Sequence, residues 1–255
     1  EELPRERERP KPSNLETPQV ELSPLPKGLK HAFLGPGDTF PIIISSELSA
    51  EQEKKLIKLL KEHKSALGWI IVDIKCISSL ICSHRIHLEE GAQPRRDPQR
   101  RLNPTMKEVV KKEVLKLLDA GIIYPISDSQ WVSPTQVVPK KSGVTVVENE
   151  NGIPVPTRVV SGWRMCIDYR KLNTATRKDY FSLPFIDQIL ERVVGHPFYY
   201  FLDGYSGCYH IEIAIEDQEK TTFTCPFGTC AFRRMPFRLC NVPATFQHCM
   251  LSIFS

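Results

Sequence analysis

A short apolar run that ends in a single carboxylate constrains this chain most. The run consists of Phe198-Tyr199-Tyr200-Phe201-Leu202. Asp203 follows directly, and Gly204 and Gly207 then interrupt the pattern. Because the run is rich in strand-forming residues and too short for a typical helix, we predict a buried strand that presents Asp203 at its end. Asp203 either closes a turn or belongs to a set of carboxylates that hold a divalent cation such as Mg²⁺ with substrate phosphates.

The composition is that of an ordinary globular protein. With 255 residues, of which 41% are hydrophobic and 25% charged, the chain can bury a core in one or two domains. No apolar stretch approaches the ~20 residues of a membrane-spanning helix, and the first residues lack the apolar core of a signal peptide. We therefore expect an intracellular protein that is not secreted and has no membrane partner. The net charge of +4 permits a polyanionic partner without requiring one.

The N-terminal region differs in composition from the rest. Residues 1–42 hold eight of the 21 prolines, together with alternating Glu and Arg. Such a segment cannot bury enough apolar surface to offset the entropy that ordering would cost. We predict a disordered linker over residues 1–44.

Capping residues mark four helices. Each predicted helix begins with a Ser or Asn that can accept a hydrogen bond from the first turn, and three have a Pro close to the start. Ser49 is followed three residues later by Gln52, which completes a capping box. The predicted helices begin at Ser49, Asn103, Ser182 and Asn241, and the first two end near His63 and Gly121.

Alternating and β-branched residues predict strands between these helices. Asn151-Gly152 is the strongest hairpin signal in the chain, because both residues tolerate the positive φ of a two-residue turn. The predicted strands cover residues 132–138, 144–147, 155–160, 163–169, 209–215, 222–225 and 230–234. Helices that alternate with antiparallel strands indicate an α+β fold.

Several basic residues are candidates for phosphate binding. The strand period of two places Arg164 and Asp168 on one face, so Arg164 either pairs with Asp168 or is free for a bidentate phosphate contact. Lys140 and Lys141 lie at the tip of a β-unit, which is usually a solvated turn. Four arginines in an extended, proline-containing segment form either a solvated loop or contacts to a phosphate backbone. These are Arg95, Arg96, Arg100 and Arg101.

Several stretches together resemble one family, the reverse transcriptases of long-terminal-repeat retrotransposons of the gypsy type found in plants. Two of them are Arg164-Met165-Cys166-Ile167-Asp168-Tyr169-Arg170 and Phe201-Leu202-Asp203-Gly204-Tyr205. The matching stretches fall in residues 121–123, 133–134, 163–173, 201–207, 222–228, 233–237 and 241–247. The resemblance covers roughly residues 45–255 in the right order, which makes it highly specific.

The resemblance implies a right-hand polymerase that copies RNA or DNA templates into DNA with the help of two metal ions, Mg²⁺ or Mn²⁺. It implies that residues 45–100 form an N-terminal connector region and residues 101–255 the fingers and part of the palm. The implied partners are an RNA or DNA template–primer and dNTPs, and the implied location is a retroelement particle in the cytoplasm or nucleus. Because the chain begins without Met and stops inside a predicted helix, we expect a fragment of a Pol polyprotein that lacks the rest of the palm, the thumb and RNase H.

The resemblance also implies roles for single residues. Asp203 matches the first metal-binding carboxylate of the palm. Arg164 and Lys140, with Lys141 as the second choice for the lysine, match the cations that grip the incoming triphosphate. The remaining implied contacts are Gly204, Cys208 and Phe237 to the nucleotide, and Arg95, Arg96, Arg100, Arg101 and Arg170 to nucleic acid.

Three departures from the family pattern affect the expected activity. The chain contains no Asp-Asp dipeptide, and one carboxylate cannot hold two metal ions. Cys208 occupies the position at which the family usually has an aromatic residue that screens out the ribose 2′-hydroxyl. The nearest aromatic, Tyr209, lies one residue further along the chain. Arg238 replaces a Gly after Phe237, where a large side chain would disturb a backbone that needs either positive φ or a close approach to a nucleotide. We therefore expect no polymerisation by the chain alone, and the alternative function is nucleic-acid binding without polymerisation.

Overall fold

The structure is a computed structural model that describes residue 22, residues 24–148 and residues 154–254. The predicted Asn151-Gly152 turn and most of the predicted N-terminal linker lie outside the described residues. The chain divides into two compact units. The larger contains Cys76–Leu202 and the chain from Gly207 onward, and the smaller contains the described residues up to Lys75 together with Asp203–Ser206.

The smaller unit is built on a hairpin that the composition did not predict. Strands β1 (Leu29–Phe33) and β2 (Pro41–Ser45) pair antiparallel. Phe40 between them is buried and meets the edge of the Trp69 ring, with 4.9 Å between ring centroids. The predicted disordered linker over residues 1–44 is therefore wrong from Leu29 onward, because alternating apolar residues such as Ile42 and Ile44 outweigh the local proline content.

Helix α1 (Ala50–Glu62) begins with the predicted capping box. The Gln52 N–H donates to Ser49 Oγ at 3.3 Å, and the Ser49 N–H donates to Gln52 Oε1 at 2.9 Å. An ion pair of 2.7 Å between Lys30 and Glu53 connects the helix to the hairpin. Two short 3₁₀ helices, η1 (Lys64–Ala66) and η2 (Ile71–Asp73), complete this unit.

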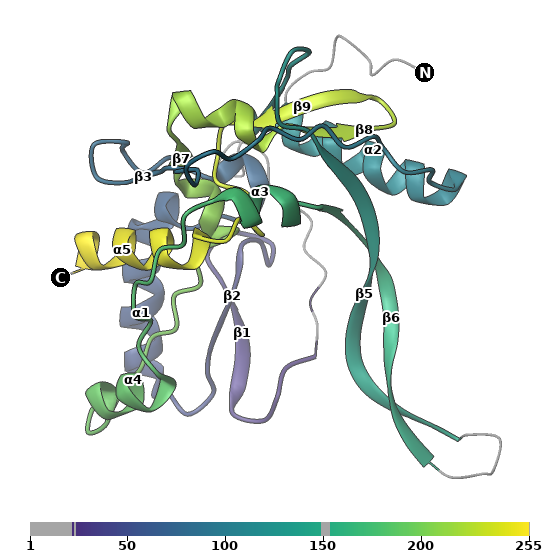
Figure 1. Cartoon of the computed structure of the whole chain (residues 1–255). Coiled ribbons are helices and arrows are strands. Elements are labelled where there is room, and N and C mark those ends of the chain that lie inside the picture. Colours follow the sequence, from purple (N-terminus) through teal and green to yellow (C-terminus); the bar gives the residue numbers. More distant parts are fainter. Residues whose placement is uncertain (1–21, 23, 149–153, 255) are drawn as a thin grey trace. The chain divides into compact units, whose positions relative to one another are not determined.

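The larger unit is organised by a five-stranded mixed sheet in the order β4-β9-β8-β5-β6. All neighbours are antiparallel except β5 and β8. Strands β5 and β6 form the long twisted ribbon that dominates Figure 1. Strand β5 covers the strands predicted over 132–138 and 144–147 as one continuous strand. Strand β6 does the same for those predicted over 155–160 and 163–169. The bounds are β4 (Ile123–Pro125), β5 (Ser133–Glu148), β6 (Pro154–Ile167), β8 (Phe223–Cys225) and β9 (Gly228–Phe232).

Helix α2 (Pro104–Asp119) packs against this sheet and confirms the second predicted helix. Asn103 caps it, because its Oδ1 accepts from the Met106 N–H at 2.7 Å. Val110, Val114 and Leu117 on one face are buried, as the helical spacing requires. Gly121 ends the helix with a positive φ of 68°.

The remaining elements are short. Helix α5 (Val242–Phe254) confirms the last predicted helix, whereas α4 (Ile186–Val193) begins later than predicted. The predicted strand over 209–215 is wrong, since only β7 (Glu212–Ile213) is extended. The other short elements are β3 (Ser83–His84), which pairs parallel with β7, α3 (Arg170–Ala175), η3 (Gly207–His210) and η4 (Ile215–Thr221).

The apolar run over residues 198–202 forms no strand, which corrects the central prediction. Its side chains are exposed, and Phe201 is 95% exposed. Within the described ranges no strand pairs with the run. A strand needs a neighbour for its backbone N–H and C=O groups, and the composition of a segment does not specify that neighbour.

A buried polar network fixes the core of the larger unit. The Asp217 carboxylate accepts from the Ile86 N–H at 2.8 Å and forms an ion pair with Lys220, which also donates to the Ile86 carbonyl at 3.0 Å. The Tyr169 hydroxyl donates to the Thr221 carbonyl at 2.8 Å. Burial of Tyr169 anchors the end of β6 and thereby the start of α3.

Among the described residues, none of the helices has the length and apolar character that a membrane span needs.

Candidate nucleotide and nucleic-acid site

Lys140 and Arg164 share one face of the β5–β6 ribbon. The register pairs Val138 with Arg164 and Lys140 with Gly162. Lys140 is therefore the diagonal neighbour of Arg164, at the roughly 7–8 Å that separates such positions. Both side chains are exposed, and a Cβ on Gly162 would meet nothing within 4 Å. The ribbon thus presents two neighbouring cations above an open surface.

Lys141 does not continue this alternation. A register shift between Lys140 and Lys141 brings Lys141 opposite Val160. Such a bulge turns the backbone and interrupts the alternation of faces. The register therefore favours Lys140 as the partner of Arg164, and the nucleotide role of either lysine stays a prediction.

Asp168 pairs with Arg170 and not with Arg164. The Arg170 fork contacts both carboxylate oxygens, with Nε 2.7 Å from Oδ1 and Nη2 2.6 Å from Oδ2. These hydrogen bonds, and the nearby Arg100, hold the pKa of Asp168 below its ordinary value despite partial burial. Of the two alternatives for Arg164, the pair with Asp168 is therefore excluded, because β6 ends at Ile167 and its alternation stops before Asp168. Arg164 forms no ion pair with another described residue.

The segment with four arginines lies along the start of β5. Val132 forms a parallel bridge with Arg96, and its N–H donates to the Arg95 carbonyl at 2.9 Å. Gln99 exchanges two side-chain hydrogen bonds with the backbone of Thr135, at 2.9 and 3.0 Å. The segment is extended and tied to the sheet, while Arg95, Arg96, Arg100 and Arg101 are all exposed. Their contacts to nucleic acid, and those of the exposed Arg170, stay predictions.

The loop after Met235 is held in a strained conformation. Arg238 has a φ of 91°, in the region that favours Gly. Of the two predicted alternatives for this position, positive φ is confirmed, and the close approach to a nucleotide stays a prediction. Asn173 of α3 fixes the loop by donating to the Arg238 carbonyl at 2.8 Å and accepting from the Cys240 N–H at 2.9 Å. This arrangement leaves Phe237 73% exposed. Sequence reasoning missed the role of Asn173, because nothing local indicates a contact 65 residues away.

Cys208 and Tyr209 have different environments. Cys208 is partly buried in η3, and burial raises the pKa of its thiol. Tyr209 stacks on Phe232 of β9, with ring centroids 6.4 Å apart, and burial raises the pKa of its hydroxyl. Tyr209 is half-buried and packs against the sheet. A Cβ on Gly207 would lie 3.0 Å from the Phe246 ring of α5, so a larger residue here would require that ring to shift by a few tenths of an ångström.

Asp203 and Gly204 belong to the smaller unit, whereas Lys140, Arg164 and Phe237 belong to the larger one. Asp203 and Gly204 are both exposed. In the part of the chain that the structure describes, no group of three or more His, Cys, Asp or Glu residues could hold a metal ion. A single exposed carboxylate does not fit a centre for two Mg²⁺ ions, which needs several oxygen ligands from the protein and substrate.

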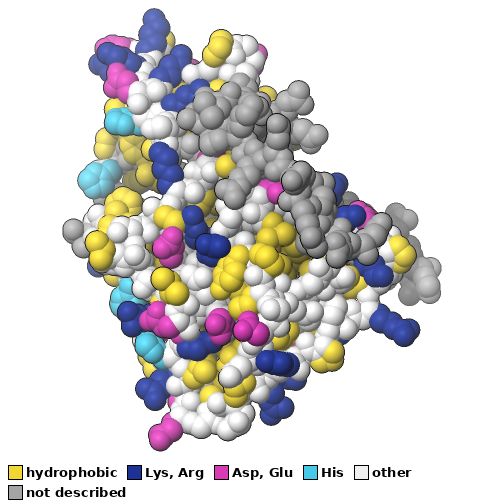
Figure 2. All heavy atoms as spheres, turned by 90° about the horizontal axis from the view of Figure 1, so that it is seen from above, with side chains coloured by type: hydrophobic (Ala, Val, Ile, Leu, Met, Phe, Trp, Pro, Cys, Tyr) yellow, Lys and Arg dark blue, Asp and Glu magenta, His cyan; other side chains and the backbone are white. Residues whose placement is uncertain are grey.

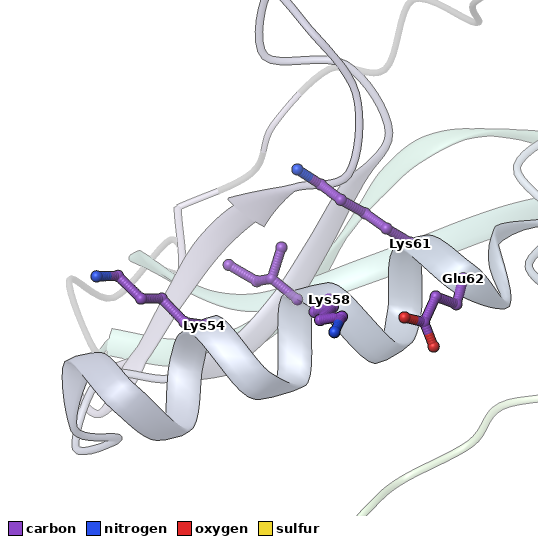
Figure 3. Close-up of a pocket in the computed structure, with 5 residues that line it drawn as sticks. Lys54, Lys58, Lys61 and Glu62 are labelled. Atoms are coloured by element: carbon purple, nitrogen blue, oxygen red, sulfur yellow. The ribbon is translucent and has the colours of Figure 1, made fainter.

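Helix α1 carries a second basic feature, shown in Figure 3. Lys54, Lys58 and Lys61, with Ile57 and Glu62, line a shallow groove of about 470 Å³. The spacing of these lysines places them along one side of the helix. Figure 2 shows further Lys and Arg side chains spread over the visible face, between acidic and hydrophobic ones. We interpret the α1 lysines as a solvated helix face.

Comparison with known proteins identifies the class. Residues 138–255 match the family described as reverse transcriptase (RNA-dependent DNA polymerase). A retrovirus-related Pol polyprotein from transposon 297 of Drosophila melanogaster is 36% identical over 144 residues, which cover 56% of this chain and 12% of that protein. The polyprotein from transposon gypsy of the same organism is 39% identical over 153 residues, which cover 59% and 14%.

Solved structures show the same fold. The crystal structure of the prototype foamy virus protease-reverse transcriptase, in its selenomethionine-labelled CSH mutant, matches with a TM-score of 0.62 and 22% identity. The match covers 81% of this chain and 25% of that one. Residues 138–255 are therefore similar to the reverse transcriptases, and the chain shares the fold of a solved one. The curated relatives are Pol polyproteins of transposons, and the chain spans only a small part of their length.

Proposed function

We propose that this chain supplies the nucleotide-gripping fingers and the first palm carboxylate of a retrotransposon RNA-directed DNA polymerase, which extends primers with dNTPs. The observation that carries this proposal is the diagonal placement of Lys140 and Arg164 on an open face of the ribbon. Residues 138–255, which match the reverse transcriptases, include both cations.

The chemistry of the two cations suits a triphosphate. The Arg164 guanidinium presents a planar fork for two phosphate oxygens, while the Lys140 ammonium acts as a compact point charge. Because Asp168 is neutralised by Arg170, it does not compete with phosphate for Arg164. The two cations would then position the triphosphate and stabilise charge that develops on it during transfer.

Phe237 and Asn173 complete the proposed nucleotide site. Asn173 holds the loop that presents the exposed Phe237 ring. An exposed aromatic on a rigid loop can pack on the sugar or base of a nucleotide. In this proposal Asn173 is a positioning residue, since its hydrogen bonds are to protein backbone.

The proposed metal is Mg²⁺ or Mn²⁺, with Asp203 as one ligand. When bound, such ions activate the primer hydroxyl and neutralise phosphate charge. Since the described residues do not form a two-metal centre, we assign no catalytic step to them through a metal. The carboxylates that would complete the centre are not supplied by an Asp-Asp dipeptide in these 255 residues.

The second candidate function is nucleic-acid binding without polymerisation. It is favoured by the lone carboxylate of Asp203 and by the row of exposed arginines beside β5. A foamy viral protease-reverse transcriptase with 20% identity and a TM-score of 0.54 is solved in complex with an RNA/DNA hybrid. By analogy, the arginines would bind the phosphates of a template–primer without reading its sequence.

Primer extension separates the two candidates. The chain, and a version continued with the remaining palm of a relative, would be assayed with poly(rA)/oligo(dT), dTTP and either Mg²⁺ or Mn²⁺. Binding of the hybrid would be measured in parallel by fluorescence anisotropy. Extension by the continued version alone supports the polymerase. Binding without extension in both supports the second candidate, and absence of binding in both contradicts both candidates.

A further inference from the structure

The larger unit contains a second concave site, apart from the ribbon residues Lys140 and Arg164. It has a volume of about 500 Å³ and is lined by three segments: residues 82–87, residues 177–179 and the first turns of α5. This volume falls within the roughly 300–1,000 Å³ of small-ligand sites. The sequence analysis assigned no ligand contact to the residues that line this site.

The first wall follows from strand alternation. His84 and Ile86 are buried in the core, so Ser83, Arg85 and His87 face outward and line the cavity. The Arg177 N–H donates to the His87 carbonyl at 2.8 Å. This hydrogen bond joins the first wall to the second segment and brings Arg177 beside it.

The third wall is one face of α5. Asn241, Thr245 and His248 follow helical spacing and all line the cavity. The Asn241 side chain donates to the Arg177 carbonyl at 2.8 Å and accepts from the Asp179 N–H at 3.1 Å. Asn241 therefore fixes the second segment against the helix, so the cavity is held by defined hydrogen bonds.

The charges in the cavity favour an anion. Arg85, Arg177 and Lys178 contribute three positive charges against the one carboxylate of Asp179. Arg85 lies 3.9 Å from Glu216, and Arg177 lies 3.9 Å from Glu89, with all four side chains more than half exposed. Exposed pairs at this distance contribute little. Both guanidinium groups can therefore turn toward a ligand at small cost.

The remaining polar groups suit the same ligand. Lys178 donates to the carbonyls of Asn173 and Thr176, which holds its charge at the wall of the cavity. The imidazoles of His87 and His248 and the hydroxyl of Ser83 add hydrogen-bonding groups. Two guanidinium forks match the oxygens of phosphate groups.

We propose that this cavity binds phosphate groups, with Arg85 and Arg177 as the principal contacts. The phosphates come either from the backbone of a single-stranded nucleic acid or from a free nucleotide, and both share the chemistry that the arginines recognise. The proposal does not depend on the triphosphate role of Arg164, because the two sites have no residue in common.

The test measures binding of fluorescein-labelled rA₁₂ to the full chain by anisotropy at several salt concentrations. Arg85→Gln and Arg177→Gln are each compared with Arg192→Gln, which removes an exposed arginine of α4 outside the cavity. We expect each cavity variant to lower affinity at least about threefold more than Arg192→Gln. The slope of log affinity against log salt concentration should also become smaller in magnitude by about one. Equal effects of all three variants would overturn the proposal.

Competition with ATP and inorganic phosphate identifies the source of the phosphates. Displacement of rA₁₂ by ATP would assign the cavity to free nucleotides, and resistance to ATP would assign it to backbone phosphates.

The imidazole NMR signals of His87 and His248, assigned with His→Gln variants, should shift with the bound probe. Arg85→Lys keeps the charge and guards against a folding defect in Arg85→Gln. If rA₁₂, ATP and inorganic phosphate all leave the two signals unmoved, the proposal is wrong.

Discussion

Asn173 holds the backbone on both sides of Leu239. Its side chain donates to the Arg238 carbonyl at 2.8 Å and accepts from the Cys240 N–H at 2.9 Å. These two bonds keep Arg238 at a φ of 91°, a conformation that costs a residue with a Cβ roughly 1–2 kcal/mol. A contact between α3 and a distant loop thus maintains local strain beside Phe237.

Replacement of Arg238 by Gly should relieve this strain. We expect Arg238→Gly to raise the free energy of unfolding by up to about 1 kcal/mol relative to Arg238→Ala, since only Gly adopts this φ freely. Urea denaturation of both variants measures the difference. A lower midpoint for Arg238→Gly than for Arg238→Ala would show that the φ of this residue is not strained.

Removal of the Asn173 side chain should release the loop. Asn173→Ala loses two hydrogen bonds and should destabilise the chain by about 1–3 kcal/mol. Asn173→Asp keeps an acceptor for the Cys240 N–H and loses the donor to the Arg238 carbonyl. Its stability should therefore fall between that of Asn173→Ala and that of the unchanged chain. Urea denaturation gives the ranking, and equal stability of Asn173→Ala and the unchanged chain would contradict the role of Asn173.

The features that sequence analysis predicted correctly are those determined by neighbouring residues. The Ser49 capping box and the Asn103 cap both depend on contacts a few residues apart. The α+β fold followed from the alternation of such elements. The resemblance of whole motifs then identified the family, which the match over residues 138–255 confirms.

The failures have a common cause in contacts between distant segments. The run over 198–202 has the composition of a strand, but strand formation requires a partner that the described residues do not provide. The alternative in which Arg164 pairs with Asp168 required the strand period to continue past Ile167, where β6 ends. The phosphate cavity depends on three segments that only the folded chain brings together.

Acid should destabilise the larger unit through His84. Burial lowers the pKa of His84 from 6.5 to about 4, although the nearby Asp217 opposes this shift. Below pH 6.5 the unfolded chain therefore binds a proton that the folded chain does not. Stability should fall as the pH drops from about 6.5 to about 4, by about 3 kcal/mol in total from this group.

Denaturation of the chain and of His84→Gln between pH 4 and pH 7 measures this contribution. His84→Gln can retain a hydrogen bond to Thr245, whose hydroxyl lies 2.9 Å from His84 Nδ1. The variant should lose less stability than the unchanged chain over this range. Identical pH dependence in the two proteins would exclude His84 as the responsible group.

Loss of the Arg164 fork should weaken nucleotide use. We consider the version continued with the remaining palm of a relative, here called the palm-completed protein. In it, Arg164→Ala should raise the KM for dTTP about tenfold to a hundredfold, since a hydrogen bond to a charged group contributes about 1.5–3 kcal/mol. Arg164→Lys keeps the charge and should lie between Arg164→Ala and the unchanged protein. Steady-state primer extension measures both, and an unchanged KM and kcat in Arg164→Ala would remove Arg164 from the nucleotide site.

The most direct test of the proposed function is dTTP incorporation by the palm-completed protein with Asp203→Asn. This change removes the carboxylate charge while keeping the size of the side chain. We predict that incorporation on poly(rA)/oligo(dT) falls below detection while affinity for the hybrid stays within about twofold, because the proposed function assigns phosphate binding to the exposed arginines and not to Asp203. Retained incorporation would show that Asp203 is not the catalytic carboxylate, and would contradict the assignment of this chain to the polymerase active site.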